Sequence, residues 1–180
     1  DIVTGQTKKE FSLPNDPHFG WLSVHSDYLV TTIAPIAVKL PKKDKENAEV
    51  VDSRFGSGSS QLAVFNRQTG ELLWQRDAKF NFRHNNIALG GGSIYVIDSL
   101  TEVRLNALSR RGLKPKGKPS LSALDIKTGK VFWQTDKEIF GTFLNYSTEL
   151  DLLLQAGSAF RDRAKDDIGQ GMIAYQGSNG

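Results

Sequence analysis

The chain has 180 residues, a net charge of +3 and no cysteine. This length allows a substantial hydrophobic core, and the missing cysteines exclude a disulfide framework and a thiolate metal site within it. No apolar run approaches the roughly 20 residues that cross a bilayer as a helix, so we expect no transmembrane segment.

The dominant feature of the sequence is a phrase that occurs twice. Residues 62–75 (LAVFNRQTGELLWQ) return as residues 121–134 (LSALDIKTGKVFWQ), with a constant offset of 59 positions. Weaker copies lie near 1–11 and at 172–180. A fixed internal phrase at this spacing indicates a repeat architecture.

Each strong copy predicts a β-hairpin. Its turn has a short polar side chain that can bond the backbone, a threonine and a glycine that permits positive φ, and an apolar strand ending in tryptophan follows. These positions are Asn66, Thr69, Gly70 and Trp74 in one copy, and Asp125, Thr128, Gly129 and Trp133 in the other. A large ring at the same place in successive hairpins indicates packing between neighbouring units. The alternative is a tryptophan in the core of a single sandwich.

A second predicted hairpin precedes each closing phrase along the chain. The paired runs are 21–25 with 28–32, 86–89 with 93–97, and 143–147 with 152–155. Long insertions then separate these pairs from the phrases, at 33–60, 99–120 and 157–171. Two hairpins per repeat give four antiparallel strands, which is the unit of a β-propeller blade.

The predicted fold is therefore all-β, an incomplete β-propeller of about three blades. A closed propeller takes about four to eight blades, so we expect the chain to be a slice of a longer protein or one part of a ring completed elsewhere. The expected partners are the remaining blades or another protein, because sheet edges would otherwise stay unpaired.

The basic residues gather in the connections, with acidic neighbours among several of them. No aromatic residues are interspersed with them as in single-strand nucleic-acid sites. We interpret these groups as solvated loops and expect no nucleic-acid partner.

All three insertions should leave the same face, which also receives the connections into the first strand of each blade. Insertions on one face often build a binding surface. The candidate ligand or partner residues from these loops are His18, Arg83, His84, Asn85, Arg161, Asp162 and Arg163. Arg83 and His84 could hold an anionic group. The alternative is that they cap strand ends and bond loop carbonyls. No catalytic residue or metal ligand is predicted.

The segment 123–133 (ALDIKTGKVFW) resembles the tryptophan-docking motif of the pyrroloquinoline-quinone (PQQ) propeller repeat, and the copy ending at Trp74 is similar. In the first copy Thr4-Gly5 is kept but the apolar aromatic is Phe11, two residues late. The resemblance implies a structural docking role for Gly70, Trp74, Asp125, Thr128, Gly129 and Trp133, and a periplasmic or otherwise extracytoplasmic bacterial protein.

That family contains two functional classes. One class is the quinoprotein alcohol or sugar dehydrogenases, for which the resemblance would imply PQQ, calcium, an Asp base and usually an adjacent cysteine pair. The other class is the non-catalytic members, which use the ring for docking. This chain has no cysteine, and no residue matches the calcium ligands or the base. The favoured hypothesis is a non-catalytic protein- or ligand-binding scaffold without a cofactor, and the alternative is part of a PQQ-dependent dehydrogenase.

Overall fold

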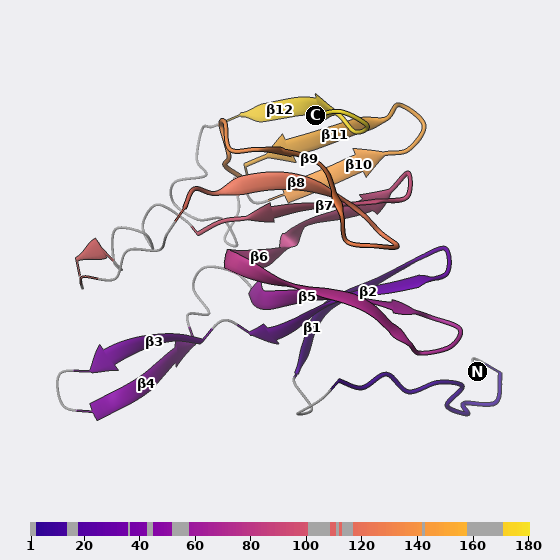
Figure 1. The fold of residues 1–180 in the computed structure, drawn as a ribbon, viewed down its shortest axis with the longest axis horizontal. Helices are drawn as coiled ribbons and strands as arrows, with labels where there is room; N and C mark the ends of the chain where they lie inside the picture. Colours follow the sequence, from indigo (N-terminus) through magenta and orange to yellow (C-terminus); the bar gives the residue numbers. More distant parts are fainter. Residues whose placement is uncertain are drawn as a thin grey trace.

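The computed structural model describes residues 3–13, 18–35, 37–42, 45–51, 58–100, 109–110, 112, 117–141, 143–157 and 171–180. Its sheets are antiparallel throughout and stack along the molecule (Figure 1). The strands are β1 (Phe19–His25), β2 (Tyr28–Pro35), β3 (Ala37–Lys42), β4 (Lys45–Val51), β5 (Gly58–Asn66), β6 (Leu72–Gly90), β7 (Ser93–Asp98), β8 (Ser120–Asp125), β9 (Val131–Thr135), β10 (Phe143–Ser147), β11 (Leu152–Ala156) and β12 (Met172–Gln176). The predicted all-β fold is confirmed.

Strand β6 divides the largest sheet into two blades. The strand order is β1-β2-β5-β6-β7-β8-β9. The start of β6, at Leu72–Asp77, pairs with β5, whereas its end, at Ile87–Gly90, pairs with β7. Blade 1 is therefore β1, β2, β5 and the start of β6, and blade 2 is the end of β6 with β7, β8 and β9. One strand carries the chain from the last position of one blade to the first position of the next.

Strands β10, β11 and β12 form a third sheet, blade 3, within this chain. Strand β6 contacts both β1 and β10, so the first strands of the three blades lie near one another. This arrangement of antiparallel blades, with their first strands adjacent and the sheet left open, is that of a partial β-propeller.

The core consists of side chains packed between the blades. Strand residues alternate between the two faces of each sheet, so Val64 faces blade 2 while Ala63 and Phe65 belong to a separate cluster on the opposite face. Between blades 2 and 3, Tyr95 and Leu121 pack with Leu144 and Leu153. Because both faces of a blade are covered, several strands are apolar at consecutive positions.

Two tryptophans bridge successive blades at corresponding positions. The Trp74 indole Nε1 donates to the Ile126 carbonyl at 2.9 Å, and a Cβ on Gly129 would lie 2.8 Å from the Trp74 ring. Trp133 repeats the geometry one blade later, donating to the Gly177 carbonyl at 2.7 Å and resting on Gly180. Each ring thus packs on a turn glycine of the next repeat, where any side chain would displace it.

In the first repeat, the side chain that covers the turn glycine is not a tryptophan. The Lys9 side chain lies over Gly70, as the Trp74 ring lies over Gly129. Phe11, the aromatic that the sequence comparison assigned to this repeat, instead packs edge-on against Phe65 with centroids 5.7 Å apart. Lys9 is therefore the positional counterpart of the tryptophans, and its alkyl chain covers the glycine.

The long insertions connect equivalent strand ends. The ladders that flank them begin at the pairs Pro35 with Ser59, Asp98 with Ser120, and Ala156 with Met172. The first insertion contains the β3–β4 hairpin, which projects away from the large sheet (Figure 1) and was not predicted from the sequence.

Candidate functional site

The candidate residues Arg83, His84 and Asn85 lie on β6, where this strand crosses from blade 1 to blade 2. The backbone at Arg83 is still in register with Gly58 of β5, and pairing with β7 is regular again from Ile87 onward. The three side chains consequently enter different surroundings although they are consecutive in sequence.

His84 joins a cluster of hydroxyl groups contributed by blade 1. Its Nε2 lies 3.0 Å from Ser59 Oγ and 3.2 Å from Thr32 Oγ1, and the Ser59 hydroxyl donates to Thr32 Oγ1 at 3.0 Å. Thr32 Oγ1 also accepts the Trp21 backbone N–H at 2.9 Å. We call these groups, His84, Ser59 and Thr32, the hydroxyl cluster.

Close packing against β1 encloses the hydroxyl cluster. A Cβ on Gly20 would lie 2.7 Å from Ser59 Oγ and Thr32 Oγ1 and 2.8 Å from His84 Nε2, so only glycine fits there without displacing the cluster. Burial lowers the pKa of His84 below its ordinary value of 6.5, because desolvation disfavours the charged imidazolium.

The burial of this cluster argues against nucleophilic catalysis by Ser59. Ser59 is fully buried, whereas a serine nucleophile needs access to substrate. The hydrogen bonds instead tie strands β2, β5 and β6 together.

Arg83 points away from the hydroxyl cluster and towards blade 3. Its guanidinium Nη1 donates to the Gly141 carbonyl at 3.3 Å, and the Asn86 side-chain amide donates to the same oxygen at 3.4 Å. Both side chains are buried. The sequence analysis did not select Asn86, although an asparagine in an apolar strand is a signal that a buried polar group needs partners.

The other sequence-selected residues do not join this group. His18 and Asn85 are exposed, and no hydrogen bond between them and Arg83 or His84 is found in the described ranges. Arg161, Asp162 and Arg163 lie outside the described residues. Among the described residues, the structure therefore places Arg83 and His84 in adjacent but separate polar contacts and joins neither of them to His18 or Asn85.

In the described part of the chain, no three His, Asp or Glu side chains are arranged to hold a metal ion. The buried guanidinium of Arg83 donates to a backbone carbonyl. Among the described residues, no helix has the length and apolar character needed to span a membrane.

Comparisons with known proteins were made for the sequence and for the fold. No protein-family model matches the sequence, and no curated protein matches it either. Similar solved structures include a europium-containing methanol dehydrogenase (TM-score 0.45, 11% identity), covering 87% of this chain and 30% of that one. A quinohemoprotein alcohol dehydrogenase from Pseudomonas putida HK5 (TM-score 0.44, 12% identity) covers 94% and 34%, respectively.

BamB from Moraxella catarrhalis is similar at a TM-score of 0.44 and 13% identity, over 88% of this chain and 46% of BamB. The chain thus spans less than half the length of each of these three proteins.

Proposed function

We propose that this chain is a segment of a PQQ-like β-propeller that serves as a protein- or ligand-binding scaffold outside the cytoplasm of a bacterium. The single observation that carries the proposal is that the long insertions leave and re-enter the blades at equivalent positions. Each long insertion joins the second and third strands of a blade at equivalent ladder ends. Variable loops on a rigid repeat scaffold are the usual way to build a binding surface.

The interactions between blades support the same proposal. We infer that the Trp74 and Trp133 contacts are docking elements that fix the blades relative to one another, since each joins a ring to a turn of the next repeat. The polar residues at the crossover, Arg83 and His84, have protein partners on neighbouring strands. These groups position loops and strands, which is what a rigid scaffold requires.

The remaining blades are the second expected partner. Apolar side chains stay exposed at both ends of the stack, with Leu22 and Val24 on β1 and Phe143 and Met172 on blade 3. Exposed apolar side chains on the face of a sheet favour coverage by another sheet.

The first experiment separates a scaffold from a dehydrogenase. The full-length protein is incubated with PQQ and calcium, and cofactor absorbance and dye reduction with alcohols and sugars are measured. We expect neither uptake nor turnover. Saturable PQQ binding with dye reduction would refute the scaffold proposal and favour the alternative.

The second experiment tests the insertion face directly. Residues 37–51 are replaced by a short Gly-Ser linker, and the melting temperature and the set of cross-linked partners are compared with those of the unmodified protein. We expect unchanged melting and loss of at least one partner. Retention of every partner would show that this hairpin is not part of the binding surface.

A further inference from the structure

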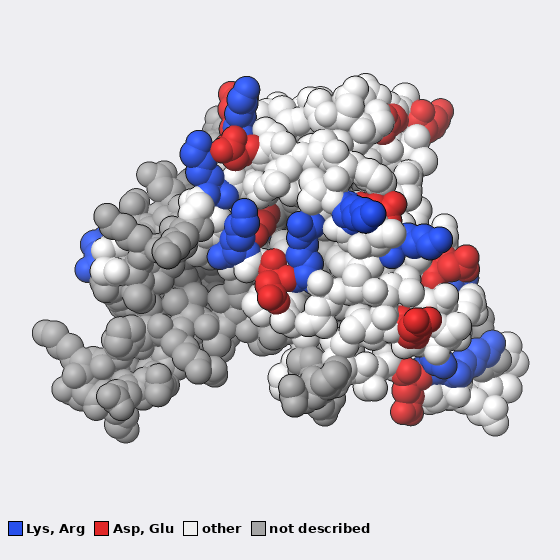
Figure 2. All heavy atoms as spheres, viewed as in Figure 1, with Lys and Arg blue, Asp and Glu red and all other residues white. Residues whose placement is uncertain are grey.

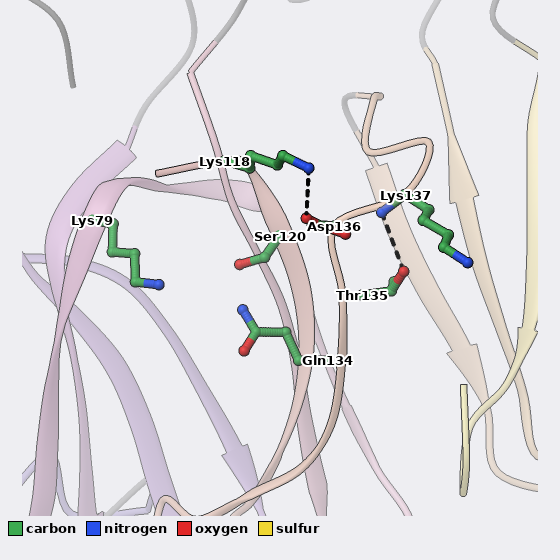
Figure 3. Close-up of a pocket in the computed structure, with 7 residues that line it drawn as sticks. All are labelled: Lys79, Lys118, Ser120, Gln134, Thr135, Asp136 and Lys137. Carbon is green, nitrogen blue, oxygen red and sulfur yellow. Dashed lines mark hydrogen bonds and ion pairs between the residues drawn. The ribbon is translucent and has the colours of Figure 1, made fainter. Parts of the chain in front are cut away.

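A polar pocket of about 550 Å³ lies at the end of blade 2 where β8 begins and β9 ends. Its lining includes Lys79 from the crossover part of β6, Lys118 and Ser120 at the start of β8, and Gln134 and Asp136 at the end of β9 (Figure 3). None of these residues was selected by the sequence analysis. The pocket thus combines side chains from the blade 1 to blade 2 crossover with side chains from the two last strands of blade 2.

Asp98, at the end of β7, fixes the backbone on which two of these side chains stand. Its carboxylate accepts the backbone N–H groups of Lys79 at 2.7 Å and of Phe80 and Asn81 at 2.9 Å. Asp98 is also the cross-strand partner of Ser120. The Asp98 carboxylate therefore holds the crossover, and the Asp98 backbone pairs with the start of β8, which gives the pocket a defined geometry.

The charge of the pocket is positive. Three lysines line it, and Asp136 is its one lining carboxylate. The Lys137 side chain points away from Ser120 and Gln134 (Figure 3), so Lys79, Lys118 and Asp136 leave one net positive charge around these groups. Figure 2 shows Lys and Arg side chains gathered, with acidic groups among them, over the middle of this face. Lys118 Nζ pairs with Asp136 Oδ2 at 3.2 Å, and both side chains are exposed at 76% and 49%. Within the described ranges, neither Lys79 nor Lys137 has a carboxylate partner.

Neutral hydrogen-bonding groups complete the lining. Ser120 is only 5% exposed, yet its hydroxyl points into the pocket towards the side of Lys79 (Figure 3). The side-chain amide of Gln134 faces the same space (Figure 3). In the part of the chain that the structure describes, no hydrogen bond is formed by the hydroxyl of Ser120 or by the amide of Gln134. Both groups can therefore donate to a ligand.

This combination fits a phosphate group better than a carboxylate or a cation. A phosphate monoester carries about −1.5 to −2 charges near pH 7 and offers three acceptor oxygens, which matches the positive lining and the several donors. Lysine binds phosphate as a point charge, and three oxygens can accept from more of the lining donors than the two oxygens of a carboxylate. We propose that this pocket binds the phosphate group of a small phosphorylated molecule, with Lys79 and Lys118 as charged contacts and Ser120 and Gln134 as neutral donors.

Asp136 has a distinct role in this proposal. Its carboxylate competes with the ligand for Lys118 and repels an incoming anion, so removing its charge should strengthen binding. Removing the Lys79 charge should weaken it. A surface that attracts anions without a defined site would respond to any lysine, so a lysine at the opposite end of the same hairpin, Lys127 in the β8–β9 turn, is the matched control.

The experiment measures binding by calorimetry and by amide chemical shifts in the full-length protein at low salt. The probes are inorganic phosphate, glucose 6-phosphate, glucose, and vesicles of phosphatidylcholine with or without phosphatidic acid. For an exposed charge pair we expect Lys79→Gln to weaken phosphate binding about two- to fivefold and Asp136→Asn to strengthen it about two- to fivefold. Lys127→Gln should leave binding unchanged.

Preference for glucose 6-phosphate over phosphate would support a small phosphorylated ligand, whereas binding confined to vesicles with phosphatidic acid would assign the pocket to a lipid headgroup and contradict the small-molecule ligand. Either outcome must shift the Lys79 and Ser120 amides. Equal losses for Lys79→Gln and Lys127→Gln, equal binding of glucose and glucose 6-phosphate, or the absence of saturation with every phosphate probe would overturn the proposal. This result is independent of the proposed scaffold function, because every residue that lines the pocket lies outside the hairpin that is replaced in the scaffold experiment.

Discussion

Replacing Trp133 with alanine should destabilise the junction between blades 2 and 3. The ring stacks with Tyr175 at 6.2 Å, lies near Tyr95 at 6.2 Å, and donates a hydrogen bond to Gly177 at 2.7 Å. Truncating a fully buried tryptophan costs about 3 to 5 kcal/mol. Because this ring is only half-buried, we expect a loss of about 2 to 4 kcal/mol in the free energy of unfolding, with about 1 kcal/mol of it due to the hydrogen bond.

Urea denaturation followed by tryptophan fluorescence and far-UV circular dichroism would measure this loss. Trp133→Phe keeps most of the ring and removes the N–H, so it should lose only the hydrogen-bond part. The matched control is Phe132→Ala, since Phe132 is the adjacent residue on β9 and is 57% exposed. A Phe132→Ala loss equal to that of Trp133→Ala would refute the reasoning, because the effect would then come from β9 and not from the junction.

Three further measurements probe other positions. Gly129 has φ +70 and lies against the Trp74 ring, whereas Gly92 has φ +78 and nothing within 4 Å of an added Cβ. We expect Gly92→Ala to lower the free energy of unfolding by the about 1 to 2 kcal/mol of left-handed strain, and Gly129→Ala to lower it by more. Equal losses would exclude a clash with the ring. Lys9→Trp should raise the melting temperature by about 2 to 4 °C if the indole adds about 1 kcal/mol, and a lower melting temperature would show that this repeat cannot accept the ring. Burial lowers the pKa of His84, so the unfolded chain binds its proton more readily and stability should fall as the pH drops below about 6.5; His84→Gln should remove that part of the pH profile, and an unchanged profile would contradict it.

The blade architecture was predictable because its determinants are local and repeated. The strand pairs and their short turns depend on alternation and on glycine or polar turn residues, and the structure places β7 and β8 where the sequence pattern does. The crossing of β6 between blades was not predictable. Its 19 residues include Asp77 and Asn85, and the continuation of one strand through such polar positions, with an irregular ladder between Phe82 and Ile87, depends on neighbouring strands that are distant in sequence.

The candidate site was less accessible from the sequence for a related reason. Arg83 and His84 were found because charged residues at a strand entry are conspicuous, but their partners are a carbonyl at Gly141 and hydroxyls at Ser59 and Thr32. Serine, threonine and backbone groups carry no sequence signal for such a role. The proposed phosphate pocket was missed for the same reason, since its lysines are ordinary loop residues until the crossover brings them together.

The two kinds of contact between blades have different consequences for binding. The tryptophan contacts join ring to turn, whereas Arg83 and Asn86 on β6 both donate to Gly141 in the connection that enters blade 3. Blade 3 holds the same connection through the Gln155 amide, which donates to the Glu138 carbonyl at 2.9 Å. The position of that connection is therefore set by β6 and by blade 3 together. Since buried donors left without an acceptor are costly, removing blade 3 would destabilise blade 2 by more than the loss of apolar contacts alone. The loop face is thus a property of stacked blades, and a single isolated blade would not reproduce its geometry.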